Sequence, residues 1–210
     1  AAAGGRHRVS IVHKANILPL TDGLFRDCAR EVAARYPQLQ VDEMLVDTAA
    51  LKLAVDKSGY GKRQLAQGRA WGVAVHESFE SVVAYVVEAS VQDGVPKLHA
   101  VTAGVHCNLC VNPRAVETQV QGAAIMALGT TMPTHRVTFK DGVVEQNNFY
   151  DMAMPRLTDA PKVMTVSIVP SNDPPKGMGE PGLPPLAPAL ANAVARLTGQ
   201  RQRELPFRFA

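Results

Sequence analysis

The sequence predicts an α+β fold, in which a mixed, largely antiparallel sheet with packed helices follows a small α/β segment. Residues 9–57 alternate strand-like and helix-like stretches, which is the pattern of an α/β unit. Residues 71–106 contain consecutive Val-rich stretches separated by turn residues, as is typical of antiparallel strands. Residues 114–131 and 186–198 carry apolar side chains at helical spacing, so we expect two helices packed on the sheet.

The composition is that of an ordinary globular chain. Its 210 residues are 46% hydrophobic and 20% charged, which suits one or two domains with a core. The net charge is +3 and no basic run is interleaved with aromatic residues, so no nucleic-acid partner is expected. No apolar stretch approaches the roughly 20 residues that cross a bilayer, and no signal-peptide pattern is visible. We therefore expect a cytoplasmic protein without membrane contact.

The N-terminal part is predicted to alternate strands and helices. Residues 9–13 form a short apolar strand, and an apolar face at helical spacing then predicts a helix that ends at Pro37. Residues 41–46 alternate like a second strand. Asp47 and Thr48 are then expected to cap a further helix, because short polar side chains accept hydrogen bonds from free backbone N–H groups.

Turn residues mark the ends of the two later helices. Asn112 and Pro113 open the helix predicted over residues 114–131, since Pro suits a first helical turn. Gly199 follows residues 186–198 and suits the left-handed conformation that ends many helices.

A hairpin and one more strand are predicted between these helices. The hairpin joins residues 135–140 to residues 143–149 around Asp141-Gly142, a dipeptide that favours a tight type I′ turn. Residues 162–169 are apolar and rich in Val, and they predict the additional strand.

Glu180 is the strongest candidate for a functional residue. It is the only charged side chain within residues 177–194. Gly179 and Gly182 have no Cβ, so a bulky group can approach the backbone on either side of it. The positive N-terminal end of the following helix would favour a carboxylate. The alternative is a solvated Glu in a Gly/Pro loop before a surface helix.

The string GMGEPGLPPLAPALANAVARLTG at residues 177–199 resembles the C-terminal signature of the molybdenum-cofactor subunit of the xanthine oxidase family, in its isoquinoline 1-oxidoreductase-like branch. The resemblance extends over residues 51–206. It implies a molybdenum–molybdopterin cofactor and makes Glu180 the catalytic base, which takes a proton from a hydroxyl on molybdenum. The oxygen, which derives from water, then attacks an N-heteroaromatic or aldehyde substrate, and a hydride passes to the metal's sulfido ligand.

The same resemblance assigns cofactor contacts. The segment TQVQGA at residues 118–123 is similar to the family's GQVEGA, whose first Gln contacts the oxo group of molybdenum, and Gln119 matches it. An amide N–H₂ can hold such an oxygen without titrating. Thr118 replaces the family's Gly, and the alternative for Gln119 is a solvent-facing helical side chain. Gly179 would let the metal's ligands approach.

The cysteines do not indicate a metal site. Cys107 and Cys110 form a C-x-x-C pair, but no second pair completes a zinc site, so we expect buried thiols. The three cysteines of the chain are too few for an iron–sulfur cluster and argue against a disulfide framework. Electrons would therefore leave through a partner subunit that holds the iron–sulfur clusters.

A second resemblance covers residues 8–51. The motifs HKAN, TDGLF and VDEMLVD are similar to an internal piece of the isocitrate/isopropylmalate dehydrogenase family. In that family the residue matching Lys14 assists proton transfer and the residue matching Asp47 ligates Mg²⁺ or Mn²⁺. The further acidic ligands of that enzyme have no counterpart here, and the alternatives are a solvated lysine and a helix cap.

The two resemblances predict a fusion of a dehydrogenase-like α/β fragment, residues 1–51, with the C-terminal part of a molybdopterin-binding subunit, residues 52–210. The family's large subunit is several times longer, so we expect little or no turnover from this chain alone. Two alternatives stay open: a non-enzymatic or chimeric fragment, and the remnant of a Mg-dependent β-decarboxylating dehydrogenase.

Overall fold

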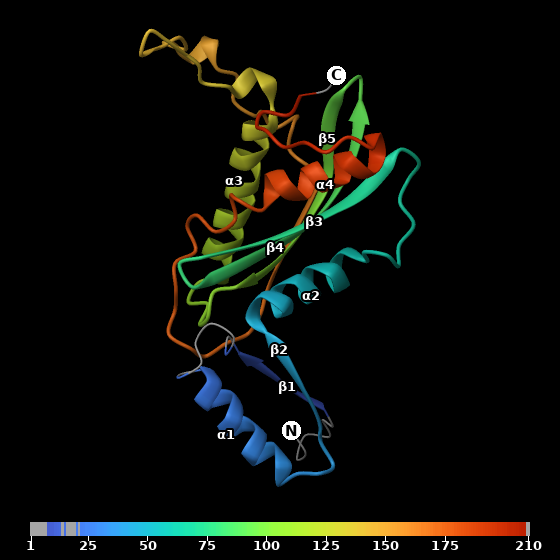
Figure 1. The fold of residues 1–210 in the computed structure, drawn as a ribbon, viewed down its shortest axis with the longest axis vertical. Helices are drawn as coiled ribbons and strands as arrows, with labels where there is room; N and C mark the ends of the chain where they lie inside the picture. The colour runs from blue at the N-terminus through green and yellow to red at the C-terminus, as the bar shows by residue number, and fades with distance from the viewer. Residues whose placement is uncertain (1–7, 14, 16–19, 21, 209–210) are drawn as a thin grey trace. The chain divides into compact units, whose positions relative to one another are not determined.

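The computed structural model describes residues 8–13, 15, 20 and 22–208. The chain divides into two compact units, Ala1–Ala49 and Ala50–Ala210, and the division falls within helix α2 (Val46–Ser58). The predicted α+β class is confirmed, with a main sheet that is mixed and mostly antiparallel (Figure 1). Among the described residues, no helix combines the length and apolar character needed to cross a bilayer.

The N-terminal unit is a strand–helix–strand arrangement. Strands β1 (Arg8–His13) and β2 (Gln40–Leu45) pair in parallel, and helix α1 (Asp22–Ala34) connects them. Helix α2 begins directly after β2, so the prediction that Asp47 precedes the helix is wrong. Asp47 lies instead in the first turn, where the helix dipole still favours a negative charge.

The C-terminal unit is built on a four-stranded sheet in the order β3-β4-β5-β8. Strands β3 (Arg69–Ser78), β4 (Ser81–Gln92) and β5 (Val95–His106) form the predicted antiparallel meander. Strand β8 (Val163–Ile168) pairs in parallel with β5, because the chain crosses back through a helix before it rejoins the sheet.

One face of the sheet forms the hydrophobic core with the helices α3 (Pro113–Thr131) and α4 (Leu186–Thr198). Alternate residues of β4 point into this core, namely Val83, Tyr85, Val87 and Ala89. Helix α4 lies against β3 and β4 (Figure 1). It approaches so closely that a Cβ on Gly72 would lie 2.7 Å from the backbone nitrogen of Ala193. Gly72 therefore allows this helix to sit on the sheet.

The opposite face of the sheet packs against the part of α2 that follows residue 49. Gly104 of β5 faces this helix, and a Cβ there would lie 3.0 Å from the backbone nitrogen of Ala54. Ala50 and Ala54 are fully buried, as is Ala84 of β4. Small residues on both elements thus permit the close approach of α2 to this face of the sheet.

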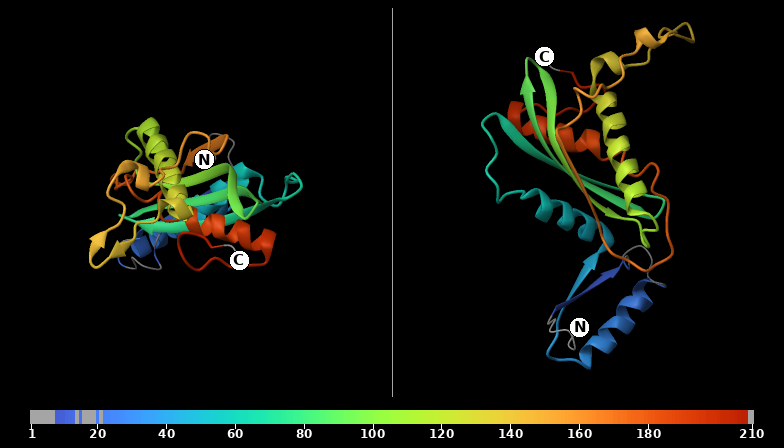
Figure 2. Two further views of the ribbon diagram at one scale, coloured as in Figure 1. Left: turned by 90° about the horizontal axis from the view of Figure 1, so that it is seen from above. Right: turned by 180° about the vertical axis from the view of Figure 1, so that it is seen from behind.

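The segment after α3 carries a short hairpin that stands away from the sheet (Figure 2). Its elements are η2 (Pro133–His135), β6 (Phe139–Lys140), β7 (Val143–Val144) and η3 (Phe149–Asp151). Asp141 and Gly142 have φ values of 51° and 81°, as the predicted type I′ turn requires. The strands are shorter than predicted, because Phe139 and Val143 are exposed and no burial extends the pairing.

Candidate functional site

Helix α4 fixes the C-terminal side of the Glu180 loop. The helix begins at Leu186 after Pro185 and ends at Thr198, as the sequence predicts, and Gly199 adopts φ 75° as its C-cap. Its inner face is fully buried, with Leu186, Leu190 and Val194 packed in the core. The loop therefore leads into a rigid, well-anchored element.

Gly182 anchors the loop to helix α3. A Cβ on Gly182 would lie 3.3 Å from the Cα of Val120 and 3.1 Å from the Cβ of Ala123. It would also lie 3.0 Å from the Tyr85 hydroxyl oxygen. The Leu183 N–H donates to the Glu180 carbonyl at 2.9 Å, which closes a turn around the anchor. The absence of a side chain at residue 182 allows the loop to pack this closely.

The N-terminal side of the loop lies against the turn between β3 and β4. A Cβ on Gly177 would lie 3.1 Å from the Cβ of Phe79. The Lys176 ammonium pairs with the Glu80 carboxylate at 2.7 Å. Both ends of the loop are therefore held by elements of the C-terminal unit.

Glu180, Gln119 and Gly179 all lie on the surface. Gln119 immediately precedes Val120, and Glu180 lies two residues before Gly182, so the contact between Val120 and Gly182 brings the two candidates onto adjacent segments. Within the described part of the chain, the Glu180 carboxylate forms no hydrogen bond or ion pair. An added Cβ on Gly179 would meet nothing within 4 Å. These three residues are therefore open to a ligand.

These side chains fit one wall of a molybdopterin site. Gly179 offers an open backbone surface for a bulky group, Gln119 offers a neutral donor, and Glu180 offers a carboxylate that no described residue engages. Among the described residues, no group of three or more His, Cys, Asp and Glu side chains could hold a metal ion.

Tyr85 is a site-supporting residue that sequence reasoning missed. It is fully buried, and its hydroxyl donates to the Val120 carbonyl at 3.1 Å. Burial raises the pKa of Tyr85 far above its usual value, so it remains a donor. A single Tyr in a Val-rich strand was an available signal, because a buried phenol needs a hydrogen-bond partner. The bond fixes the turn of α3 that carries Gln119.

The C-x-x-C pair lies at the end of β5. Cys107 is buried and Cys110 is partly buried. Burial raises the pKa of the Cys107 thiol to about 11, and the neighbouring Cys110 contributes. Cys107 is therefore a protonated thiol within the core, which agrees with the packing role expected for it.

Of the two dehydrogenase-like candidates, the structure describes only Asp47. Lys14 lies outside the described residues. Asp47 is partly buried in the first turn of α2.

Comparison with known proteins supports both resemblances. A family described as a molybdopterin cofactor-binding domain matches residues 26–161, a range that includes Gln119 but not Glu180. The isoquinoline 1-oxidoreductase subunit beta of Brevundimonas diminuta is 32% identical over 143 residues, covering 67% of this chain and 18% of that protein. Subunit gamma 1 of the mitochondrial NAD isocitrate dehydrogenase of Rattus norvegicus is 57% identical over 53 residues, covering 25% of this chain and 14% of that protein.

A solved structure supports the fold. The aldehyde oxidoreductase from Desulfovibrio desulfuricans matches with a TM-score of 0.50 and 20% identity, covering 60% of this chain and 14% of that chain. The chain thus spans less than a fifth of the length of each of these relatives. The resemblance to molybdenum hydroxylase subunits and the cofactor that it implied are confirmed at the level of the family. The chain belongs to the molybdopterin cofactor-binding domain family.

Proposed function

We propose that residues 52–210 are the C-terminal part of a molybdenum hydroxylase subunit, fused to a dehydrogenase-like fragment at residues 1–51. One observation carries the proposal: Gly182 packs against Val120, which holds the Glu180 loop beside the turn of α3 that carries Gln119. The two residues that the family resemblance selects are 61 positions apart in the sequence, yet they lie on adjacent segments.

Each residue has a role that its chemistry supports. Glu180 acts as the general base, because its carboxylate is exposed and engaged by no described residue. Gln119 donates a hydrogen bond to an oxygen of the cofactor, and Gly179 allows the close approach. When bound, molybdopterin supplies the metal that accepts the electrons and the water-derived oxygen that is inserted. Residues 181–183 hold the base in position through their buried turn.

The substrate is an N-heteroaromatic compound or an aldehyde, and the electrons pass to an iron–sulfur partner. The three cysteines, of which Cys107 is buried in the core, offer no cluster site. Glu180 and Gln119 are exposed, so they provide only one wall of a pocket. The opposite wall belongs to the portion of the relatives that this chain does not span, and we expect little or no turnover from the chain alone.

The test uses a chimera with an active relative. The segment of the Brevundimonas diminuta subunit that corresponds to residues 52–199 is replaced by the segment from this chain. The chimera is produced with its partner subunit in a host that makes the cofactor. Molybdenum content and dye reduction with isoquinoline are then measured for the chimera and for its Glu180→Gln and Glu145→Gln variants. Glu145 is an exposed carboxylate beside the β6–β7 hairpin, so it controls for the loss of one negative charge.

We expect the chimera to bind molybdenum and to reduce the dye. Glu180→Gln should keep the metal and lose turnover by at least about 100-fold, the usual contribution of a general base. Glu145→Gln should behave like the parent. Turnover of the Glu180→Gln variant within about tenfold of the parent would refute the assignment of the base. A chimera without molybdenum would favour the non-enzymatic or chimeric fragment.

A further inference from the structure

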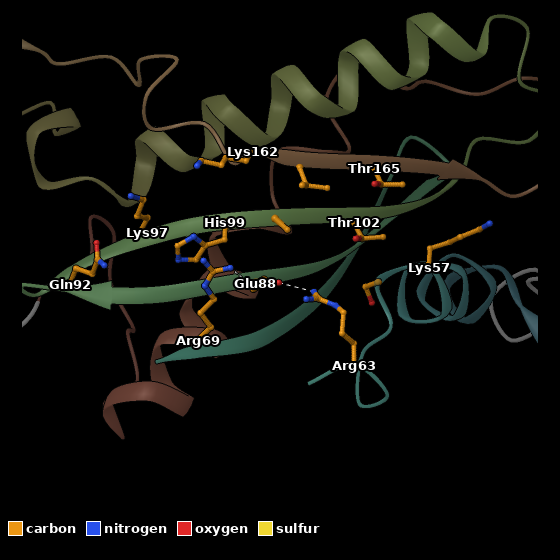
Figure 3. A pocket seen from close by; sticks show the side chains of 13 residues that line it. Lys57, Arg63, Arg69, Glu88, Gln92, Lys97, His99, Thr102, Lys162 and Thr165 are labelled. Carbon is orange, nitrogen blue, oxygen red and sulfur yellow. Dashed lines mark hydrogen bonds and ion pairs between the residues drawn. The ribbon is translucent and has the colours of Figure 1, made fainter. Parts of the chain in front are cut away.

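A basic groove of about 670 Å³ lies on the sheet of the C-terminal unit, apart from the Glu180 loop. We define it by Lys57, Arg69, Lys97, His99, Thr102 and Lys162, which Figure 3 shows around it. Gln92, in the hairpin end of β4 and β5, also lines it. The Glu180 loop instead meets Phe79, in the turn between β3 and β4 at the opposite end of β4. Thr102 lies on the same side of β5 as Gly104, which faces α2, whereas Gly182 contacts Tyr85 on the core side, so the two sites lie on opposite faces of the sheet.

A β-bulge in β5 shapes the groove. Glu88 pairs with Ala100 and Ala89 pairs with Leu98, so His99 is the extra residue of β5. The bulge breaks the alternation of side chains, because one strand gains a residue with no partner opposite. Leu98 points into the core, whereas Lys97, His99 and Ala100 all line the groove.

The charges that line the groove are unbalanced. Glu88 is nearly fully buried, and it accepts hydrogen bonds from Arg63 at 2.7 Å and from Arg69 at 2.5 Å. Glu88 is the one carboxylate among the described residues that line the groove, and it is already paired with two cations. Within the part of the chain that the structure describes, Lys57, Lys97 and Lys162 form no ion pair. Lys97 and Lys162 thus line the groove without a counterion among the described residues, and the Lys57 side chain extends away from it (Figure 3).

The positive charges of the groove affect the pKa of His99. Burial lowers the pKa of His99, and Arg69, Lys97 and Lys162 lower it further, against the opposing effect of Glu88. The His99 Nε2 lies 2.8 Å from the Ser90 hydroxyl. Arg69 of β3, Lys97 of β5 and Lys162, which immediately precedes β8, therefore all lie near the His99 imidazole.

The floor of the groove adds neutral donors. Thr102 of β5 pairs with Thr165 of β8, and both side chains line the groove (Figure 3). Hydroxyl groups can donate to anionic oxygens, and lysine is a common phosphate ligand that acts as a point charge. The volume lies within the range of small-molecule sites, roughly 300–1,000 Å³.

We propose that the basic groove binds a small phosphate-bearing anion, held by Lys97 and Lys162 at one end and by the threonine hydroxyls along the floor. The unpaired Lys97 and Lys162, the bulge that turns His99 into the groove and the hydroxyls of Thr102 and Thr165 support this assignment. The site is independent of the proposed hydroxylase function, since it requires neither Glu180 nor Gln119.

Isothermal titration calorimetry with pyrophosphate tests the proposal on the full 210-residue chain at constant ionic strength. The variants are Lys97→Gln and Lys162→Gln, and the matched control is Lys140→Gln. Lys140 is exposed in the β6–β7 hairpin and does not line the groove, so it removes the same charge elsewhere.

Saturable binding of one pyrophosphate per chain is expected. Each groove variant should weaken binding about tenfold or more, as the loss of one charge-assisted contact implies. The Lys140→Gln control should bind like the parent. An absence of binding at millimolar pyrophosphate, or an equal loss in the control and groove variants, would overturn the proposal. Circular dichroism of each variant distinguishes a lost site from a lost fold.

Discussion

Substitution of Gly72 by Ala tests how helix α4 is held on the sheet. A Cβ at residue 72 would lie 2.7 Å from the Ala193 backbone nitrogen, and it would lie closer still to the Ala189 carbonyl. An ordinary contact begins near 3.4 Å, so the helix backbone would have to move outward by at least about 0.7 Å. The obstacle is the backbone of a packed helix, which cannot rotate away as a side chain can.

The expected cost follows from overpacking. An extra methyl group in a packed core costs about 1–3 kcal/mol, and more where nothing can yield. Because the inner face of α4 is fully buried, we expect Gly72→Ala to lower the free energy of unfolding by at least about 3 kcal/mol. Gly122→Ala is the matched control, since an added Cβ there meets nothing within 4 Å. It lies inside α3, where Ala is favoured over Gly by about 0.8–1 kcal/mol, so this variant should be stabilised.

Urea unfolding measures both variants. Trp71, the only tryptophan, lies in β3, so its fluorescence reports on the C-terminal unit, and far-UV circular dichroism serves as a second probe. With a slope of about 1–3 kcal/mol per molar urea, the Gly72→Ala midpoint should fall by about 1 M or more. The Gly122→Ala midpoint should rise. If Gly72→Ala unfolds at the parent's midpoint or above it, the contact between α4 and the sheet is not what the structure shows.

Three further predictions concern the groove and the loop. Glu88→Gln should cost about 1–3 kcal/mol at pH 7, less than a deeply buried pair because Arg63 and Arg69 remain partly exposed. Burial raises the pKa of Glu88, but hydrogen bonds from both arginines outweigh it and lower the pKa overall. The stabilisation by the Glu88 carboxylate should thus be complete above the unfolded-state pKa near 4.5, and it should disappear as the pH falls through the lower folded-state pKa. A difference in unfolding free energy between the parent and Glu88→Gln that does not change with pH would contradict this. In an NMR titration, His99 should show a pKa below 6.5, and saturating pyrophosphate should raise it; a downward shift would argue against an anion beside the ring. Gly182→Ala should leave the fold intact while it displaces the Glu180 loop by a few tenths of an ångström. Turnover of the chimera should therefore fall without loss of molybdenum. Unchanged turnover would show that the contact at Gly182 does not position Glu180.

Local chemistry allowed much of the fold to be predicted from the sequence. The bounds of α4 and its end at Gly199 agree with the structure, because apolar periodicity and a left-handed glycine act within a few residues. The type I′ turn at Asp141-Gly142 was predictable for the same reason. The helix start at Val46 was not, since a strand that runs directly into a helix leaves no room for a separate capping residue.

The functional candidates came from a motif resemblance, and their spatial relation came only from the tertiary structure. No local rule places Gly182 against Val120, because that contact depends on how α4 and α3 pack on the same core. The basic groove was equally hidden, since Lys57, Lys97 and Lys162 are far apart in the chain and a bulge turns His99 towards them. The sequence by itself therefore determined the elements and selected Glu180 and Gln119, because those signals are local. Tertiary packing alone decided which distant side chains share a surface, because contacts between distant residues depend on the whole sheet.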